Sequence, residues 1–95
     1  MKVDLSKALR RALKTGVVYL GSKRTIKAVR DGKAKLVVIA KNCPEEVMEK
    51  LKNYDVKMVT YDGTNMELGA ICGKPFSVAA LAVIDEGESE ILNIK

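Results

Sequence analysis

The chain has 95 residues, 47% of them hydrophobic, and its 17 Lys and Arg against 12 Asp and Glu give a formal net charge of +5. This length and composition predict one globular domain, residues 1–95, and the charge favours a polyanionic partner. No apolar run reaches the ~20 residues of a membrane span and no signal peptide is visible, so we expect no membrane partner and a cytoplasmic location. The chain has no histidine, which excludes a Cys/His zinc site and histidine acid–base catalysis. We expect no bound metal and no cofactor.

The first half of the chain predicts two helices and a short strand. Residues 4–14 form an amphipathic helix with a basic face that is either solvated or turned toward RNA. The apolar run 17–20 is a strand, and a helix follows from residue 22 to about residue 30. We expect Ser22 to be its N-cap and Gly32 to follow its end. The basic face consists of Lys7, Arg10, Arg11 and Lys14.

The second half alternates strands with helices. Residues 36–40 are continuously apolar, which is typical of a strand buried on both faces at the centre of a sheet. Pro44 is expected to open a helix that ends near residue 52, and a strand follows at 56–61. Thr64 and Glu67 fit a capping box for a short helix that stops at Gly73. A last strand covers 78–84, and residues 91–94 are either a helical turn or a strand. This order predicts an α/β sheet covered on both faces.

Gly21 and the residues after it allow three chemical interpretations. A phosphate-binding loop of the G-x-x-x-x-G-K-[ST] kind is disfavoured because Ser22-Lys23 reverses the required order and a strand occupies the intervening residues. A dinucleotide fingerprint is weaker still, because G-x-G-x-x-G is absent. The third is an RNA site, in which the small Gly21-Ser22 step lets the backbone approach and the cations that follow contact phosphates.

Other groups suggest no catalytic centre. The acidic residues form no clear cluster, and the serines and cysteines lack a histidine base. Cys43 and Cys72 are expected to be reduced thiols. Phe76 is either a core residue or an exposed platform for an unpaired base. We expect the protein not to be an enzyme.

Four segments together resemble a known family over essentially the whole chain. They are residues 21–28 (GSKRTIKA), residues 32–40 (GKAKLVVIA) with Asn42, residues 64–69 (TNMELG) and residues 73–78 (GKPFSV). They resemble the large-subunit ribosomal protein of the thirty-e type, found in archaea and eukaryotes. That family belongs to the kink-turn RNA-binding superfamily that includes ribosomal protein seven-Ae. The compact amino-terminal end suits an archaeal version.

The resemblance implies a three-layer α/β/α sandwich around a four-stranded mixed sheet. It implies binding to a kink-turn or internal loop of large-subunit ribosomal RNA, no catalysis, neighbouring ribosomal proteins as partners, and a monomer when free. The implied RNA-binding residues are Gly21, Ser22, Lys23, Arg24, Thr25, Lys27, Asn42, Phe76, Ser77 and Val78. Phe76 and Val78 would pack on an extruded base.

Two positions depart from the related patterns. Lys23-Arg24 replaces the Asn-Glu pair with which the seven-Ae relatives read sheared G·A pairs, so those base contacts do not transfer. Ser77 stands where some family members have arginine. The alternatives to a ribosomal site are a kink-turn in another RNA particle, such as a guide-RNA particle, and, in a different class, a small nucleotide-binding enzyme domain. Binding of a free nucleotide would favour the enzyme, whereas the RNA interpretation needs a folded oligonucleotide.

Overall fold

The computed structural model describes residues 4–93, which alternate helices and strands as the sequence predicts. The elements are α1 (Leu5–Thr15), β1 (Val17–Leu20), α2 (Ser22–Arg30), β2 (Leu36–Ala40), α3 (Glu45–Lys52), β3 (Met58–Tyr61), α4 (Asn65–Ile71), β4 (Ala80–Asp85) and the 3-10 turn η1 (Ile91–Asn93). The last element is therefore a helical turn and not a strand. Ile94, which we assigned to that element, lies outside the described residues.

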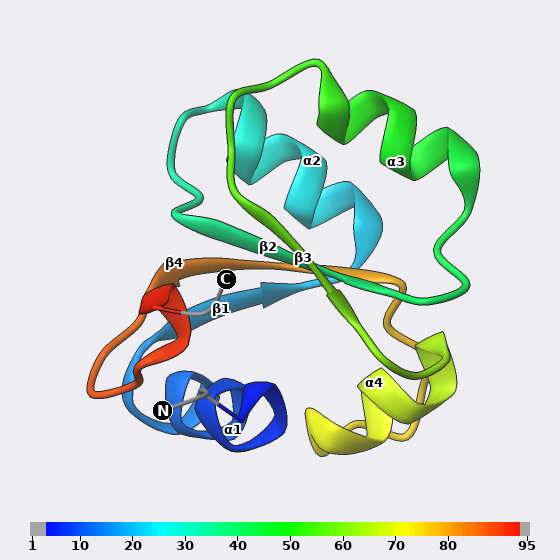
Figure 1. Ribbon diagram of the computed structural model, residues 1–95. Coiled ribbons are helices and arrows are strands. Elements are labelled where there is room, and N and C mark those ends of the chain that lie inside the picture. The colour runs from blue at the N-terminus through cyan, green and yellow to red at the C-terminus, as the bar shows by residue number, and fades with distance from the viewer. Residues whose placement is uncertain (1–3, 94–95) are drawn as a thin grey trace.

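The four strands form one mixed sheet in the order β1-β4-β2-β3. β4 pairs antiparallel with β1 and with β2, whereas β2 and β3 are parallel. Helices α2 and α3 cover one face of the sheet, and α1 and α4 cover the other (Figure 1). This arrangement confirms the expected three-layer α/β/α sandwich, with β2 inside the sheet.

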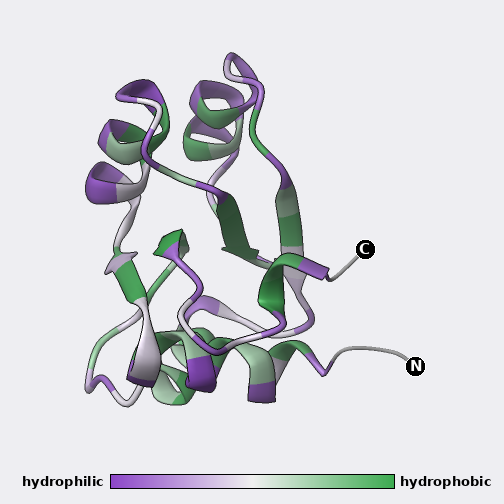
Figure 2. Ribbon diagram, turned by 90° about the vertical axis from the view of Figure 1, so that its left-hand side faces the viewer, coloured by the Kyte–Doolittle hydropathy of each residue, from purple (hydrophilic) through white to green (hydrophobic). Residues whose placement is uncertain are grey.

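β2 links the two halves of the core, because its side chains alternate between the two faces of the sheet. Leu36 and Val38 join the cluster beneath α1 and α4, and Val37 and Ile39 join the cluster beneath α2 and α3. All five residues of β2 are buried. Figure 2 shows the hydrophobic colour on the strands and the inward sides of the helices, with hydrophilic residues outside. Burial on both faces explains the unbroken apolar run.

Specific hydrogen bonds define the helix ends. The Asp4 carboxylate accepts from the Ser6 and Lys7 N–H groups at 3.0 and 3.4 Å and caps α1. Thr64 and Glu67 make both bonds of the predicted capping box of α4. At the end of α2, Gly32 has φ 72°, its N–H donates to the Val29 carbonyl at 3.1 Å, and the Lys33 N–H donates to the Ala28 carbonyl at 2.9 Å. This is the Schellman pattern expected of a glycine after a helix.

The predicted ends of four elements were wrong. Ser22 is not the N-cap of α2: the non-helical residue is Gly21, and no side chain caps this helix. Pro44 is the N-cap of α3 and not its first helical residue, because its ψ of 138° is extended. β3 begins at Met58 instead of residue 56, and β4 runs from Ala80 to Asp85 instead of 78–84. In each case hydropathy alone could not say where sheet pairing or helical dihedrals begin.

Candidate nucleic-acid interface

Four loops meet at one end of the sheet, the right-hand end in Figure 1. β1, β2 and β3 end there, and β4 begins there. Backbone hydrogen bonds connect these loops to one another and to their neighbours. In each bond the first residue donates its N–H to the carbonyl of the second: Gly21 to Ala80 (2.9 Å), Ala40 to Ala79 (2.8 Å), Lys41 to Gly63 (2.8 Å) and Val78 to Asn65 (2.9 Å). The sheet topology therefore brings the segment before β4 beside the Gly21 turn, as we expected.

Gly21 forms an open turn between β1 and α2. Its φ of 105° and ψ of 151° lie in a region that is essentially restricted to glycine. A Cβ built on Gly21 would meet no atom within 4 Å, so the turn faces open space. Because no side chain caps α2, the N–H groups of its first turn are available to a ligand, at the positive end of the helix dipole.

Three cations extend this surface along α2. Lys23, Arg24 and Lys27 are exposed, and the first turn contains no acidic residue. The Arg24 guanidinium lies 4.6 Å from the centroid of the Tyr19 ring, a cation–π contact that holds it against β1. A cavity of about 300 Å³ lies beside this contact, and its lining is Tyr19, Arg24, Lys27, Ala28, Asp31 and Lys33.

Thr25 faces the core and not the solvent. Its exposed fraction is 0%, and its Oγ1 has no hydrogen-bond partner. A direct contact between this side chain and RNA therefore has no support in the geometry, although the sequence placed Thr25 in the site. Thr25 shares a helical stripe with the buried Ala28 and Val29, and this spacing could have indicated its burial.

Asn42 ties the end of β2 to the start of α4. Its Oδ1 accepts from the Asn65 N–H at 2.7 Å, and its Nδ2 donates to the Asn65 Oδ1 at 3.3 Å. The Asn65 carbonyl in turn accepts from the Val78 N–H. Asn42 is exposed at this end of the sheet, and it also positions the segment that carries Phe76. The sequence did not predict this role for Asn65, and its only indication was the position of Asn65 directly after the Thr64 cap.

The three site residues predicted in the segment before β4 differ in their exposure to solvent. Phe76 is 53% exposed and is not a core residue, and Ser77 is also exposed. Val78 is 1% exposed and belongs to the cluster under α1 and α4. Packing of Val78 on an extruded base therefore has no support in this geometry. A Cβ on Gly69 would overlap the Phe76 carbonyl, so glycine allows this segment to lie close against α4.

The comparisons with known proteins agree with this fold. Residues 3–93 match the model of the ribosomal protein L7Ae/L30e/S12e/Gadd45 family. The chain belongs to this family. It is 59% identical over 83 residues to large ribosomal subunit protein eL30 of Archaeoglobus fulgidus, which covers 87% of this chain and 96% of that protein. It is 50% identical over 96 residues to the eL30 protein of Methanocaldococcus jannaschii, with 97% and 87% covered. The eL30 protein of Methanosarcina mazei is 48% identical over 92 residues, with 97% and 89% covered.

A further exposed apolar residue, which the sequence did not single out, lies at this end of the sheet. Met66 is 64% exposed in the first turn of α4, at the same end of the sheet as Phe76. In this member of the L7Ae/L30e/S12e/Gadd45 family, two large apolar side chains thus stand in solvent near the converging loops. A flexible methionine adapts well to an irregular partner surface.

The surroundings of the two cysteines do not favour their thiolate forms. Cys43 and Cys72 are free thiols. Burial raises the pKa of Cys72 to about 11, only partly offset by Lys74, and burial also raises the pKa of Cys43. Neither thiol is therefore activated as a nucleophile at neutral pH. Within this range no group of three or more acidic or cysteine side chains could hold a metal, and no helix is long and apolar enough to cross a membrane.

Proposed function

We propose that this protein is a structural component of the large ribosomal subunit and binds a kink-turn or internal loop of ribosomal RNA. The observation that carries the proposal is the open Gly21 turn, at the same end of the sheet as the exposed Phe76. The archaeal relatives named above are large ribosomal subunit proteins. We place the protein on the cytoplasmic ribosome, with ribosomal RNA and neighbouring ribosomal proteins as partners, and as a monomer when free.

The Gly21 turn would supply the central contact. With no Cβ, the backbone can approach a sharply bent RNA, and the uncapped N–H groups of the first turn of α2 can donate to phosphate oxygens or base edges. Lys23 and Lys27 would contact phosphates, and Ser22 would contact the same strand. Arg24 would shape the edge of this surface, because the Tyr19 ring already holds its guanidinium.

The opposite side of the site would hold an unstacked base. Specific RNA recognition uses bases that have left the helix and stack on aromatic side chains. Phe76 supplies that surface, with Ser77 beside it for a polar contact. Asn42 would make a polar contact of its own while it keeps the segment before β4 in place through Asn65. Thr25 and Val78, whose side chains are buried, would support the site from the core.

The test is titration of a ribosomal kink-turn RNA and of a straight duplex of the same base composition. We expect strong preference for the kink-turn and no binding of free nucleotides. Gly21→Ala removes the close approach. Loss of one charge-assisted hydrogen bond is worth roughly 1.5–3 kcal/mol, so affinity should fall roughly tenfold to hundredfold.

Gly32→Ala is the matched control. Gly32 also has a positive φ (72°), and a Cβ added there would also meet no atom within 4 Å. Both variants introduce backbone strain, so affinity is compared for the folded fraction of each. Equal affinities of the two variants for the kink-turn RNA would remove Gly21 from the site. Equal affinity of the unaltered protein for kink-turn and duplex would reject the proposed function itself.

A further inference from the structure

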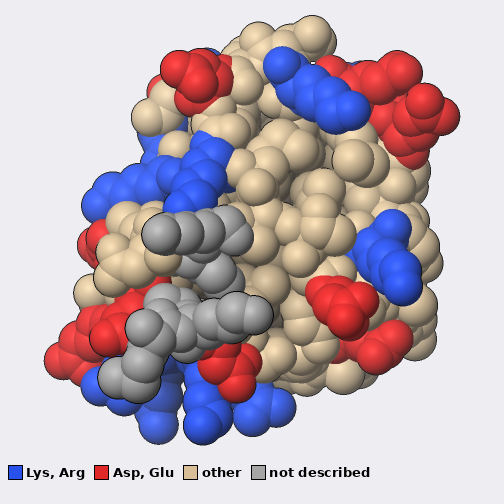
Figure 3. Space-filling model, viewed as in Figure 1, with Lys and Arg blue, Asp and Glu red and all other residues tan. Residues whose placement is uncertain are grey.

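Helix α1 carries a basic face that the proposed kink-turn site does not use. Lys7, Arg10, Arg11 and Lys14 are all exposed, and α1 lies across the sheet from α2. In Figure 3 blue side chains gather along the lower edge of the molecule, where Figure 1 places α1. We refer to these four side chains as the α1 basic face.

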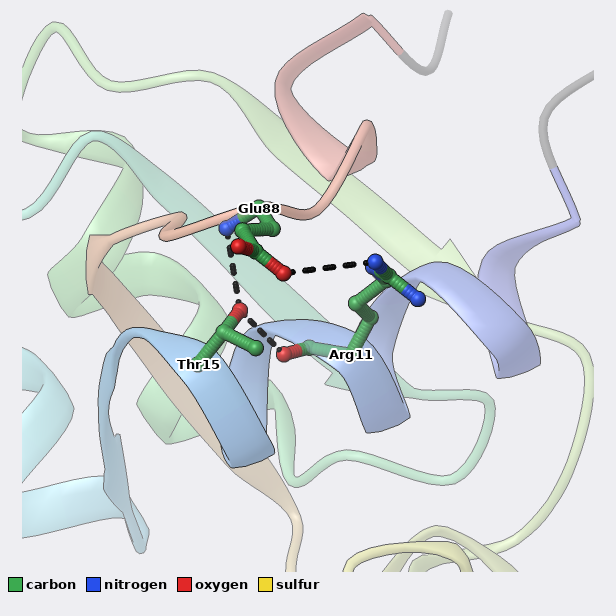
Figure 4. A network of polar contacts seen from close by, with 3 residues as sticks. All are labelled: Arg11, Thr15 and Glu88. Carbon is green, nitrogen blue, oxygen red and sulfur yellow. Dashed lines mark hydrogen bonds and ion pairs between the residues drawn. The ribbon is translucent and has the colours of Figure 1, made fainter.

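The charges of the α1 basic face are mostly not neutralised within the protein. Arg11 pairs with Glu88 at 3.3 Å, and Thr15 accepts from the Glu88 N–H, so Arg11 is turned toward the loop after β4 (Figure 4). Among residues 4–93 no carboxylate pairs with Lys7, Arg10 or Lys14. Residues three and four apart on a helix are neighbours, so these like charges oppose one another and weaken the helix. An external anion bound to this face would therefore relieve the repulsion between its cations.

A groove adjoins part of this face. It lies between α1 and the end of α4, has a volume of about 430 Å³, and is lined by Arg10, Leu13, Lys14 and residues 70–73. Its lining contains two cations and no carboxylate or aromatic side chain. Because it lacks an aromatic side chain, the groove offers an unpaired base less stacking surface than Phe76 does, whereas its cations can follow a phosphate backbone.

We propose that the α1 basic face is a second RNA-binding surface, which takes the phosphate backbone of an RNA duplex. Lys7 and Lys14 are seven residues apart, roughly 10 Å along the helix axis, so the cations form a line that can run beside one strand. The surface is separate from the Gly21 turn and reads no sequence. A protein with both sites can bridge two RNA segments, one bent and one straight.

The test uses a straight RNA duplex without a kink-turn, titrated at several salt concentrations. Arg10→Gln/Lys14→Gln is compared with Lys50→Gln/Lys52→Gln in α3, where both lysines are also exposed. Each variant removes two positive charges and lowers the net charge from +5 to +3. Since log K changes with log salt by roughly 0.7–0.9 per phosphate contact, the α1 variant should reduce the slope by roughly 1.5 units. The α3 variant should leave it nearly unchanged.

A minimal kink-turn RNA with short stems keeps this proposal distinct from the proposed function. The α1 variant should bind this RNA as tightly as the unaltered protein does. If the unaltered protein did not bind this RNA, the proposed kink-turn site would be wrong, whatever the result with the duplex. Equal duplex slopes for the α1 and α3 variants would make the α1 basic face an ordinary solvated surface. If polyglutamate bound as tightly as the duplex and lost the same affinity in the α1 variant, the surface would fit acidic proteins and the RNA proposal would fall.

Discussion

The buried Thr25 hydroxyl is a weak point of the core. Its Oγ1 has lost water and gained no hydrogen bond. Thr25→Val replaces the hydroxyl by a methyl group of similar size, so it should raise the free energy of unfolding by about 1 kcal/mol. Chemical denaturation measures this change, and Thr60→Val on the exposed side of β3 is the control.

The same variant tests whether Thr25 contacts RNA. Because the side chain is 0% exposed, Thr25→Val should bind the kink-turn RNA with unchanged affinity. A clear fall in affinity of the folded variant would mean that the hydroxyl reaches the RNA, and that α2 shifts on binding.

Phe76 is exposed, which excludes the core role that the sequence left open and leaves the stacking role to be tested. An aromatic stack on one base is worth ~1–3 kcal/mol, so Phe76→Ala should lower the affinity for kink-turn RNA roughly tenfold or more. The slope against salt should not change, because no phosphate contact is lost. Tyr54→Ala, which removes an aromatic side chain that is 36% exposed after α3, should leave the affinity as it was.

Stability provides the second measurement on Phe76. A buried phenylalanine would cost ~3–5 kcal/mol on truncation, but Phe76 is 53% exposed and should cost far less. A large loss of folding stability together with unchanged RNA affinity would show that Phe76 serves the fold alone, and this half of the proposed site would be withdrawn.

At the scale of elements, the sequence predicted each helix and strand but not every end. The capping box of α4 was readable because Thr64 and Glu67 have the correct spacing before an apolar run. Ser22 looked equally suitable as a cap, yet the N-cap is Gly21, one residue earlier, and Ser22 is the first helical residue of α2. That difference depends on how Gly21 bonds to Ala80 in the neighbouring strand, which local sequence does not encode.

Two alanine variants test these helix ends by thermal or chemical unfolding. Thr64→Ala removes a cap and should cost about 1 kcal/mol of stability. Ser22→Ala removes no capping bond and adds a better helix former, so stability should be unchanged or slightly higher. If Ser22→Ala destabilised the protein as much as Thr64→Ala, Ser22 would be the N-cap of α2 as the sequence suggested, and the geometry of the Gly21 turn would have to be revised.

At the scale of the whole molecule, the α/β class followed from the alternation of elements, and the resemblance supplied the sandwich. The strand order did not follow from pattern alone, because nothing local indicates that β4 inserts between β1 and β2. This insertion makes β4 an interior strand and places Val78 against the core just before it. It also brings Phe76 to the end of the sheet where Gly21 lies, so the site could be assembled only with long-range pairing in view.

The net charge of +5 attracts RNA to the whole protein surface. A dependence of RNA affinity on salt therefore does not by itself show which residues contact the RNA. Lys27→Ala and Lys52→Ala separate the two effects, because both lysines are exposed and each variant lowers the net charge by one. If Lys27 contacts a phosphate, its loss should make the slope of log K against log salt shallower by roughly 0.7–0.9 for the kink-turn RNA. Lys52, at the end of α3, should change the slope little, since a distant charge acts only through the screened field. Equal slopes for the two variants would return Lys27 to the solvated face of α2 and leave the Gly21 turn, with Lys23, as the contact at this helix end.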